Sequence, residues 1–372
     1  MNFTIITHVL HKKEETHLYG YGPYVWEMNI WFKYVDQVSI VAPLLKDKVG
    51  NIDLAYQHPE LNFQEVPALA LTTPVGILRS LLFLPLVSWR IYKAMQTADH
   101  IHLRCPGNMG LLGCLVQILF PNKTKTAKYA GNWDPKSKQP LAYRIQKYIL
   151  SNIFLTKNMQ VLVYGDWENQ SKNIKPFFTA TYSVSEKESI EKPSLDPVIE
   201  LIFVGSLVKG KNPMYAIRLA EKLIKKGKNV VLNIYGEGVE KEILRDYIKV
   251  NQLENHVLLH GNQNQDIIKK AYKKSHFVVL PSKSEGWPKA IAEGMFWGCV
   301  PVATKVSCVP FMLDYGNRGI LLDMDLEKDV IQLEEILENE KAFFSKSKLA
   351  LEWSQNYTTT VFETEIKKIL TE

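Results

Sequence analysis

The sequence predicts an α/β protein made of two doubly wound, Rossmann-like domains in tandem that face a cleft. Three observations lead to this fold class. Short β-branched runs alternate with helical patterns along the whole chain, which is typical of parallel sheets covered by helices. The length of 372 residues suits two domains. A polar stretch without periodicity, residues 183–197, lies between two similar halves and is the natural linker.

The first half contains five apolar, β-branched runs that we expect to be strands. They are residues 3–7, 37–42, 100–103, 126–130 and 160–163. Helical patterns fill the intervals around 23–34, 74–97, 108–119 and 140–152. Each helix then connects two parallel strands, as in the βαβ unit.

The second half repeats this rhythm. We expect strands at 199–204, 230–235, 257–260, 277–280 and 300–303, and helices near 213–226, 239–250, 265–274 and 288–297. The predicted organisation is an N-terminal domain (1–185), a linker (186–197) and a C-terminal domain (198–345). The last residues, 346–372, are helical and are expected to pack back on the N-terminal domain. Because open α/β sheets bind ligands at the carboxyl ends of their strands, two such domains in tandem predict one shared cleft.

Composition and charge exclude several other classes. Hydrophobic residues make up 46% of the chain and charged residues 23%, which excludes collagen-like, coiled-coil and disordered chains. The four cysteines show no C-x-x-C spacing, so zinc ribbons and thioredoxin-like motifs are excluded and a reduced, cytoplasmic setting is favoured. Residues 1–190 carry 20 basic and 14 acidic residues, whereas 191–372 carry 25 of each. This basic half either faces an anionic membrane or a phosphate-bearing partner, or is simply a solvated surface.

Two segments bear on membrane association. The N-terminus has no basic n-region and no long apolar h-region, so we interpret it as a first strand and not as a signal peptide. The most apolar run, residues 80–89, is flanked by Arg79 and Arg90 and is too short for the ~20 residues that span a bilayer. It is expected to be a buried core helix, or alternatively an interfacial helix at the face of a membrane.

The most informative stretch is 281–295, which follows an apolar strand and leads into a helix. Gly286 permits a tight turn, and Pro288 suits the first helical turn. The helix N-terminus is therefore a candidate anion site. Glu285 lies just before the helix and Glu293 lies inside it, where their carboxylates are suited to accept hydrogen bonds from sugar or ribose hydroxyls. Alternatively, Glu285 caps the first turn and Glu293 is a solvated helix residue.

Several ordered motifs resemble those of family 4 retaining glycosyltransferases with the GT-B fold. Glu285 and Glu293 match the E-x7-E signature, and the strand that follows resembles the family's G-x-P-V-(I/V)-(A/S)-T pattern. Residues 203–211 resemble the G-R-L-x-x-x-K-G loop, and two later glycine turns resemble G-x-G and F-x-G. The resemblance runs continuously over residues 199–325. Over residues 1–190 it depends mainly on strand order and a glycine loop.

The resemblance implies roles for single residues. Glu285 is expected beside the donor sugar, Lys211 at the diphosphate and Glu293 at the donor ribose; the alternative for Lys211 is an ordinary surface lysine. The remaining donor-binding residues are loop and turn positions, namely Gly205, Ser206, Lys209, Gly236, Gly261, Gly286, Trp287 and Pro288. The family usually has arginine at Ser206. Lys209 is the candidate substitute, although lysine and arginine are not equivalent at phosphate sites.

Candidates in the N-terminal half are fewer. Gly20 and Gly22 are expected to form a glycine loop after the first strand, or alternatively a simple tight turn. Either His102 or Arg104 is the candidate for a residue that positions the donor sugar, although a strand histidine is more often part of the core. In the loop after the fourth strand, Trp133 is expected to stack on a sugar ring while Asn132 and Asp134 bind hydroxyls; the alternative is Asp-Pro turn chemistry.

The resemblance implies a metal-independent enzyme that transfers a sugar from a nucleotide donor with retention of configuration. The acceptor is a hydroxyl of a glycan or lipid-linked glycan, in bacterial surface polysaccharide or glycolipid synthesis. We expect no cofactor besides the donor and no nucleic-acid partner, and an anionic membrane surface is a candidate partner, with the enzyme peripheral at the inner membrane face. The spacing Asp323-x-Asp325 matches a manganese motif of another fold, but a capped turn explains it better.

Two alternatives to the transferase remain open at this stage, and a third is disfavoured. A nucleotide-sugar epimerase of the same fold needs a catalytic acid and lacks the glutamate signature. An inactive sugar-nucleotide-binding protein is compatible with the missing arginine. A nicotinamide dehydrogenase is a poor match, because Lys241 stands where G-x-G-x-x-G requires its third glycine.

Overall fold

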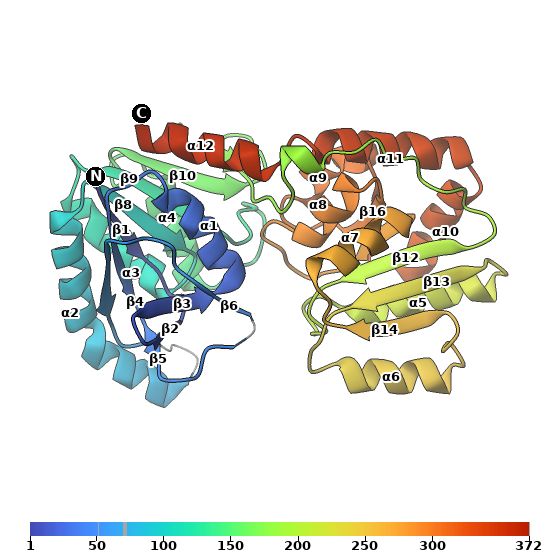
Figure 1. Ribbon diagram of the computed structural model, residues 1–372, viewed down its shortest axis with the longest axis horizontal. Helices are drawn as coiled ribbons and strands as arrows, with labels where there is room; N and C mark the ends of the chain where they lie inside the picture. Colours follow the sequence, from blue (N-terminus) through green and yellow to red (C-terminus); the bar gives the residue numbers. More distant parts are fainter. Residues whose placement is uncertain (51, 70–72, 372) are drawn as a thin grey trace. The chain divides into compact units, whose positions relative to one another are not determined.

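The computed structural model describes residues 1–50, 52–69 and 73–371, which form two compact units (Figure 1). The first unit contains residues 1–177 and the end of the chain from Glu363. The second unit contains residues 178–362.

Within the described residues, a seven-stranded parallel sheet forms the centre of the first unit. Its strand order is β11 (Ile174–Phe177), β10 (Met159–Tyr164), β9 (Thr124–Tyr129), β8 (His100–Cys105), β1 (Asn2–Ile6), β4 (Gln37–Ala42) and β7 (Leu61–Glu65). The order reverses between β1 and β8, which is the topological switch point where doubly wound sheets bind ligands.

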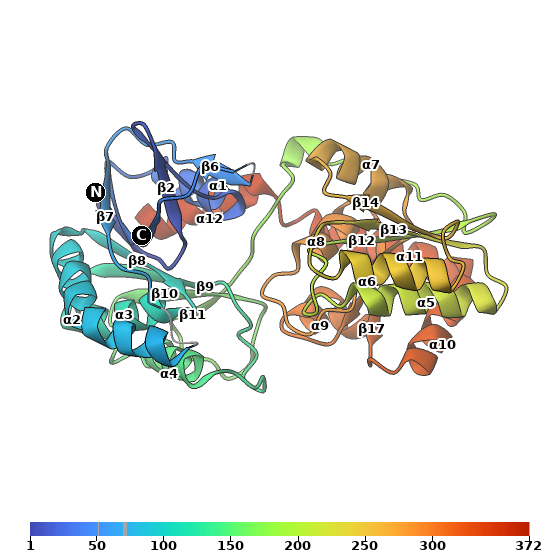
Figure 2. The same cartoon turned by 90° about the horizontal axis from the view of Figure 1, so that it is seen from below.

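Helices cover both faces of this sheet. α2 (Pro74–Thr97), α3 (Asn108–Val116) and α4 (Leu141–Ser151) lie side by side on one face (Figure 2), and η1 (Gln117–Leu119) continues α3. α1 (Gly22–Phe32) packs on the other face, where Trp31 and Phe32 contact Phe3 of β1. The end of α12 (Thr359–Thr371) lies beside it, because Glu363 accepts hydrogen bonds from Lys33 and Tyr34.

The predicted glycine loop after the first strand is wrong. A small sheet occupies this region, in the order β5 (Leu44–Leu45), β2 (His11–Glu14), β3 (His17–Tyr21) and β6 (Asp53–Ala55). Gly20 therefore lies in a strand, where a Cβ atom would be 3.1 Å from Val25 of α1. Gly22 begins α1, and its N–H donates to the carbonyl of Ile52. Both glycines allow close packing of backbone in this region.

The second unit is built on a six-stranded sheet, and all of residues 178–362 are described. Its strands are all parallel, in the order β14 (Val257–Gly261), β13 (Val230–Tyr235), β12 (Ile199–Val204), β15 (Phe277–Leu280), β16 (Val300–Thr304) and β17 (Ile320–Leu322). This order reverses between β12 and β15, as in Rossmann folds.

The helices of the second unit lie on both sides of this sheet (Figure 1). They are α5 (Pro213–Lys225), α6 (Lys241–Val250), α7 (Gln265–Lys274), α8 (Lys289–Phe296), α9 (Val309–Met312), α10 (Leu326–Leu337) and α11 (Glu340–Ser354), with the short turns η2 (Val184–Glu186) and η3 (Asp314–Gly316). α8 packs on β15 and β16, and α11 packs on α8. The site described below is formed by the loops that precede α5 and α8.

The unit boundaries differ from the predicted ones. The expected linker, residues 186–197, belongs to the second unit, where Lys192 is buried and donates hydrogen bonds to the carbonyls of Tyr272 and Ser275, both at 2.6 Å. The expectation that all of 346–372 packs on the first domain is also corrected. α11 packs on α8 within the second unit, and only the chain from Glu363 joins the first.

Candidate functional site

Two loops meet at the switch point of the second sheet. One follows β12 and leads to α5, and the other follows β15 and leads to α8. The backbone N–H of Lys283 donates to the carbonyl of Gly210 at 2.8 Å, which ties the two loops together. The parallel arrangement therefore brings residues about seventy positions apart in the sequence to one edge of the sheet.

An ion pair between Lys211 and Glu285 joins the same two loops. The Lys211 Nζ lies 2.6 Å from Oε1 and 2.9 Å from Oε2 of Glu285. The Glu285 side chain is 6% exposed and that of Lys211 is 32% exposed. The carboxylate thus holds the ammonium from the protein side and leaves part of it accessible to a ligand. A phosphate group is the natural partner for a cation held in this way.

Glycines end three neighbouring strands of this sheet. Gly205 follows β12, Gly236 follows β13 and Gly261 ends β14. Gly236 has φ +147°, and a Cβ atom there would lie 1.9 Å from the carbonyl oxygen of Gly205. Its N–H donates to the carbonyl of Gly261 at 2.9 Å. Only glycine permits this approach, so the three strand ends pack closely without side chains between them.

Glu293 lies on α8 and is partly buried. Its Oε1 accepts a hydrogen bond from the Thr181 hydroxyl at 2.7 Å, and its Oε2 accepts one from Tyr272 at 3.4 Å. Desolvation raises the pKa of Glu293, and the hydrogen bond from Thr181 opposes that rise. The carboxylate is thus oriented by its neighbours, which differs from the solvated helix residue considered as an alternative.

The remaining predicted donor residues have different environments. Ser206 and Lys209 are exposed, and the Gly286 carbonyl accepts a hydrogen bond from Ser307 at 3.2 Å. Pro288, the predicted first residue of this helix, is the N-cap of α8, which begins one residue later at Lys289. Trp287 is 7% exposed and contacts the rings of Phe178, Trp353 and Tyr357. In this structure Trp287 therefore anchors the loop within an aromatic cluster.

In the first unit, the structure separates the two candidates at the end of β8. His102 is fully buried, packs against Phe3 and Trp31, and contacts the hydroxyl of Thr126 through Nδ1 at 2.8 Å. Burial lowers the pKa of His102 well below its usual range. This ring cannot reach a ligand, so His102 is a core residue and its proposed site role is corrected.

Arg104 belongs to a cluster of charged side chains at the same sheet edge. The Glu27 carboxylate lies 2.6 Å from the buried Lys128 Nζ and 3.8 Å from Arg104 Nη1. The Arg104 guanidinium also lies over the ring of Tyr24. Sequence reasoning did not single out Glu27 or Lys128, because a lysine in a basic stretch looks like a surface residue and only the tertiary fold buries it.

His8 is a further residue that sequence reasoning missed. It follows β1 at the switch point of the first sheet, and part of it is exposed. Gly107 caps α3 beside it, where a Cβ atom would be 2.7 Å from His8 Nδ1. Desolvation and, secondly, the charge of Arg104 lower the pKa of His8. Its position after the first strand was the available sequence signal.

The loop after β9 forms a turn and does not present an exposed aromatic ring on which a sugar could stack. Trp133 is 1% exposed, packs edge-on against Tyr129 and donates through Nε1 to Gln170 at 3.1 Å. The predicted stacking role of Trp133 is therefore corrected. Asn132 accepts a hydrogen bond from the N–H of Asp134 at 2.9 Å, and Asp134 accepts one from Lys136 at 2.8 Å, which is the turn chemistry considered as the alternative.

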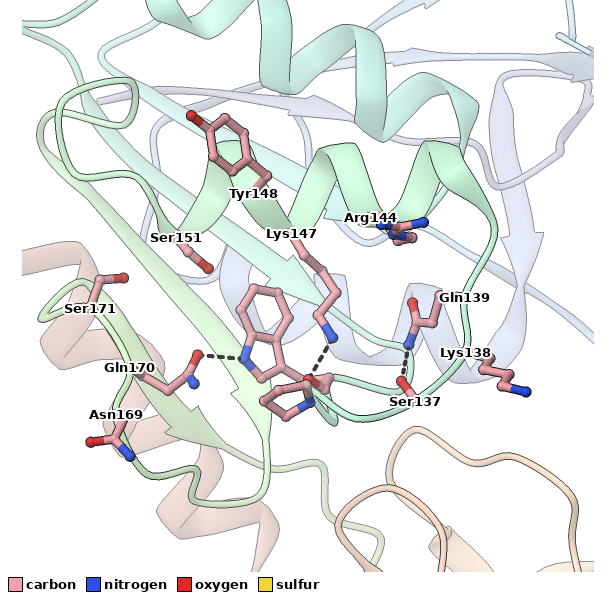
Figure 3. A pocket seen from close by; sticks show the side chains of 12 residues that line it. Ser137, Lys138, Gln139, Arg144, Lys147, Tyr148, Ser151, Asn169, Gln170 and Ser171 are labelled. Carbon is pink, nitrogen blue, oxygen red and sulfur yellow. Dashed lines mark hydrogen bonds between the residues drawn. The ribbon is translucent and has the colours of Figure 1, made fainter.

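A cavity of about 770 Å³ opens beside this loop (Figure 3). It lies at the carboxyl ends of β9 and β10 and along α4, and its lining includes Lys138, Arg144 and Lys147. Among the described residues that line it, none is acidic. Lys147 donates to the carbonyls of Trp133 and Asp134, at 2.7 and 3.0 Å. The cavity thus favours an anionic or hydroxyl-rich ligand.

The Asp323-x-Asp325 spacing is explained by local structure. Asp325 caps α10 by accepting from the N–H of Lys328, and Asp323 pairs with Lys305. Within residues 1–50, 52–69 and 73–371, no group of three or more His, Cys, Asp or Glu side chains is arranged to hold a metal ion.

Comparisons with known proteins agree with this geometry. Residues 185–357 match the family model of glycosyl transferases group 1. Anabaena HepE, solved in complex with UDP, superposes with a TM-score of 0.67 at 14% identity and covers 100% of this chain and 99% of its own. Sucrose-phosphate synthase from Thermosynechococcus elongatus gives 0.67 at 15% identity, with coverage of 100% and 98%. The fold is GT-B.

The curated relatives match only part of this chain. The N-acetylgalactosamine-N,N'-diacetylbacillosaminyl-diphospho-undecaprenol 4-alpha-N-acetylgalactosaminyltransferase of Campylobacter jejuni is 31% identical over 45% of this chain and 47% of its own length. The poly(glycerol-phosphate) alpha-glucosyltransferase of Bacillus subtilis is 26% identical over 48% and 25%. The matched segment thus spans about half of the length of the first relative and a quarter of the second.

Proposed function

We propose that this protein is a retaining glycosyltransferase that transfers a sugar from a nucleoside-diphosphate donor to a hydroxyl of a glycan or lipid-linked glycan. The observation that carries the proposal is the Lys211–Glu285 pair at the switch point of the second sheet. The helix that follows Glu285, α8, carries the oriented carboxylate of Glu293. The match of residues 185–357 to glycosyl transferases group 1 supports it.

Lys211, Glu293 and Glu285 each bind a different part of the donor in this proposal. Lys211 places positive charge where the departing diphosphate gains negative charge, and such preorganised electrostatic stabilisation needs no divalent cation. Glu293 accepts hydrogen bonds from the donor ribose, and Glu285 lies beside the sugar while it holds Lys211. The acceptor hydroxyl attacks from the face that the diphosphate leaves, and the leaving phosphate takes its proton. The configuration at the anomeric carbon is then retained.

The first unit supplies the acceptor side of the proposal. The cavity with Lys138, Arg144 and Lys147 is suited to the phosphate of a lipid-linked acceptor. The Campylobacter relative is named for a diphospho-undecaprenol substrate, and the Bacillus relative for a poly(glycerol-phosphate). We accordingly propose a cytoplasmic enzyme of bacterial surface polysaccharide or glycolipid synthesis that works at the membrane face.

A panel of nucleotide sugars tests the proposal by thermal shift and by donor hydrolysis, with and without EDTA. We expect at least one donor to raise the unfolding temperature and to be hydrolysed equally well in EDTA. Glu293→Ala should weaken donor binding much more than Lys209→Ala, which removes an exposed charge. If no nucleotide sugar binds, the transferase proposal is wrong, and equal effects of the two substitutions would contradict the assigned roles.

A further inference from the structure

The outer face of α2 is apolar, although it faces away from the protein. Its exposed side chains recur at helical spacing along one stripe: Val75 (78% exposed), Leu78 (64%), Leu82 (74%), Leu86 (39%) and Trp89 (57%). The solvent face of a helix in a soluble domain is normally polar. Only in the last turns does this stripe become polar, at Lys93 and Gln96.

The opposite face of α2 fixes the helix to the sheet. Val87, Ile91 and Met95 are fully buried in the core of the first unit. By length and composition α2 is apolar enough to cross a membrane, with 17% of its most apolar window buried. Because its inner face is committed to the domain core, the helix is suited to lie in a membrane interface and not to span the bilayer.

Apolar exposure continues onto the two neighbouring helices of the same layer (Figure 2). The additional side chains are those of Leu115, Leu119, Leu141 and Tyr148. Exposed apolar side chains gathered on one helical layer are typical of an interaction site.

The charge of this helical layer identifies the partner. The sequences of α2, α3 and α4 contain five basic residues and no Asp or Glu, and three of the basic residues, Arg79, Lys93 and Arg144, are exposed. A second protein copy would bring the same positive charge to the interface. An anionic lipid surface complements it, because Lys and Arg side chains near such a surface are attracted to its negative charge.

We propose that α2, supported by α3 and α4, docks the first unit on an anionic bilayer, with the stripe Val75–Leu78–Leu82–Trp89 inserted among the acyl chains and the basic side chains at the headgroups. This inference goes beyond the transfer chemistry, and its test does not require a donor. It brings the enzyme to the surface that presents lipid-linked acceptors.

Co-sedimentation with phosphatidylcholine vesicles, with and without phosphatidylglycerol, tests the docking. We expect the full chain to bind anionic vesicles, and higher salt to weaken binding. Leu78→Ser combined with Leu82→Ser should reduce the bound fraction at least tenfold at an unchanged unfolding temperature, because both side chains are exposed. The matched control is Val239→Ser with Val250→Ser, two residues of the second unit that are 86% and 78% exposed, and it should bind normally.

Trp89→Leu provides an independent measurement. It keeps the surface apolar, so binding should persist, while the part of the tryptophan fluorescence that brominated lipids quench should be lost. The proposal is overturned if the Leu78/Leu82 variant binds vesicles like the unaltered chain. It is also overturned if that variant loses only a concentration-dependent dimer, since the stripe would then bind a second copy. Loss of vesicle binding with unchanged transfer to a soluble acceptor would leave the proposed function standing.

Discussion

At the residue scale, the central feature is a cation that is already held in place before any ligand binds. Glu285 contacts Lys211 through both carboxylate oxygens and is itself nearly buried. Holding a flexible lysine in this way reduces the conformational entropy that a ligand must remove on binding. Lys209, two residues earlier, is exposed. It is therefore a suitable control for the effect of removing the Lys211 ammonium.

Lys211→Ala should therefore lower kcat/KM for sugar transfer by about 10²–10³-fold, the cost typical of losing one preorganised group that stabilises developing charge. Lys209→Ala should change kcat/KM by less than about threefold, a small effect typical of an exposed charge. Steady-state kinetics with a single donor measure both. A larger loss for Lys209→Ala would mean that this exposed lysine, and not Lys211, contacts the diphosphate.

Thr181 is expected to act as a positioning residue for Glu293. Thr181→Val removes the hydroxyl that donates to Glu293 and that opposes the rise of its pKa. The pKa of Glu293 should therefore rise further, so that its carboxylate is lost at a higher pH. We expect KM for the donor to increase on acidification from a higher pH than in the unaltered enzyme, with kcat little changed. Thr179→Val, at a buried threonine of the same segment, is the control and should leave the pH profile unmoved.

At the scale of elements, the ends of the strands determine what the second sheet can bind. β12, β13 and β14 converge so closely that a side chain at Gly236 would overlap the backbone of Gly205. The glycines are therefore required by contacts between neighbouring strands, and a local turn preference alone does not explain them. This geometry links the proposed donor site to the close packing of the strand ends.

Gly236→Ala should lower the free energy of unfolding of the second unit by about 1–3 kcal/mol, because the added methyl group forces the strand ends apart. Donor binding should be lost with it. Gly210→Ala is the matched control, since a Cβ atom there meets nothing within 4 Å. Thermal unfolding and donor titration check both variants. An unchanged unfolding temperature for Gly236→Ala would contradict the close approach of β12 and β13.

The segment expected to be the linker is held to the second unit by Lys192. Its ammonium donates to the carbonyls of Tyr272, Lys273 and Ser275 near the end of α7. Lys192→Met leaves these carbonyls without that donor and should lower the free energy of unfolding by about 3 kcal/mol. Lys187→Met removes an exposed lysine of the same segment and should have little effect. Chemical denaturation monitored by tryptophan fluorescence distinguishes the two variants.

At the scale of the whole molecule, three of the buried histidines lie in the first unit and one, His276, lies in the second. In the first unit His11, His100 and His102 are all buried, and burial lowers the pKa of each, to about 4 for His11 and for His100. The unfolded chain binds protons on these side chains at a higher pH than the folded one. The free energy of unfolding therefore falls as the pH falls from about 6.5 to about 4.

His100→Gln tests this dependence. Glutamine keeps a polar partner for Thr126 and does not titrate, so the loss of stability between pH 6.5 and 4 should shrink by up to about 3 kcal/mol. His17→Gln, at an exposed histidine, should leave the slope unchanged. Equal slopes for the unaltered chain and His100→Gln would show that His100 is not neutral in the folded state.

Much of the fold was predictable because hydrophobic periodicity is a local property. The strands β4, β13 and β15 and the helices α2 and α7 begin and end at the predicted residues. The hairpin of β2 and β3 was missed, since its residues alternate too weakly and become a sheet only by pairing with β5 and β6. The E-x7-E pair and Lys211 were predicted from their motifs, and the structure pairs Lys211 with Glu285. Glu27, Lys128 and His8 carried no motif.

The sequence by itself determined the doubly wound class, the order of the elements and the positions of the glutamate signature. These features are encoded in short windows of residues, where periodicity, turn chemistry and motif spacing act. Only the tertiary structure decided which side chains are accessible: it buried His102 and Trp133, paired Lys211 with Glu285, and left the apolar stripe of α2 exposed. Accessibility depends on which distant segments pack together, and that information is not contained in any one segment of the chain.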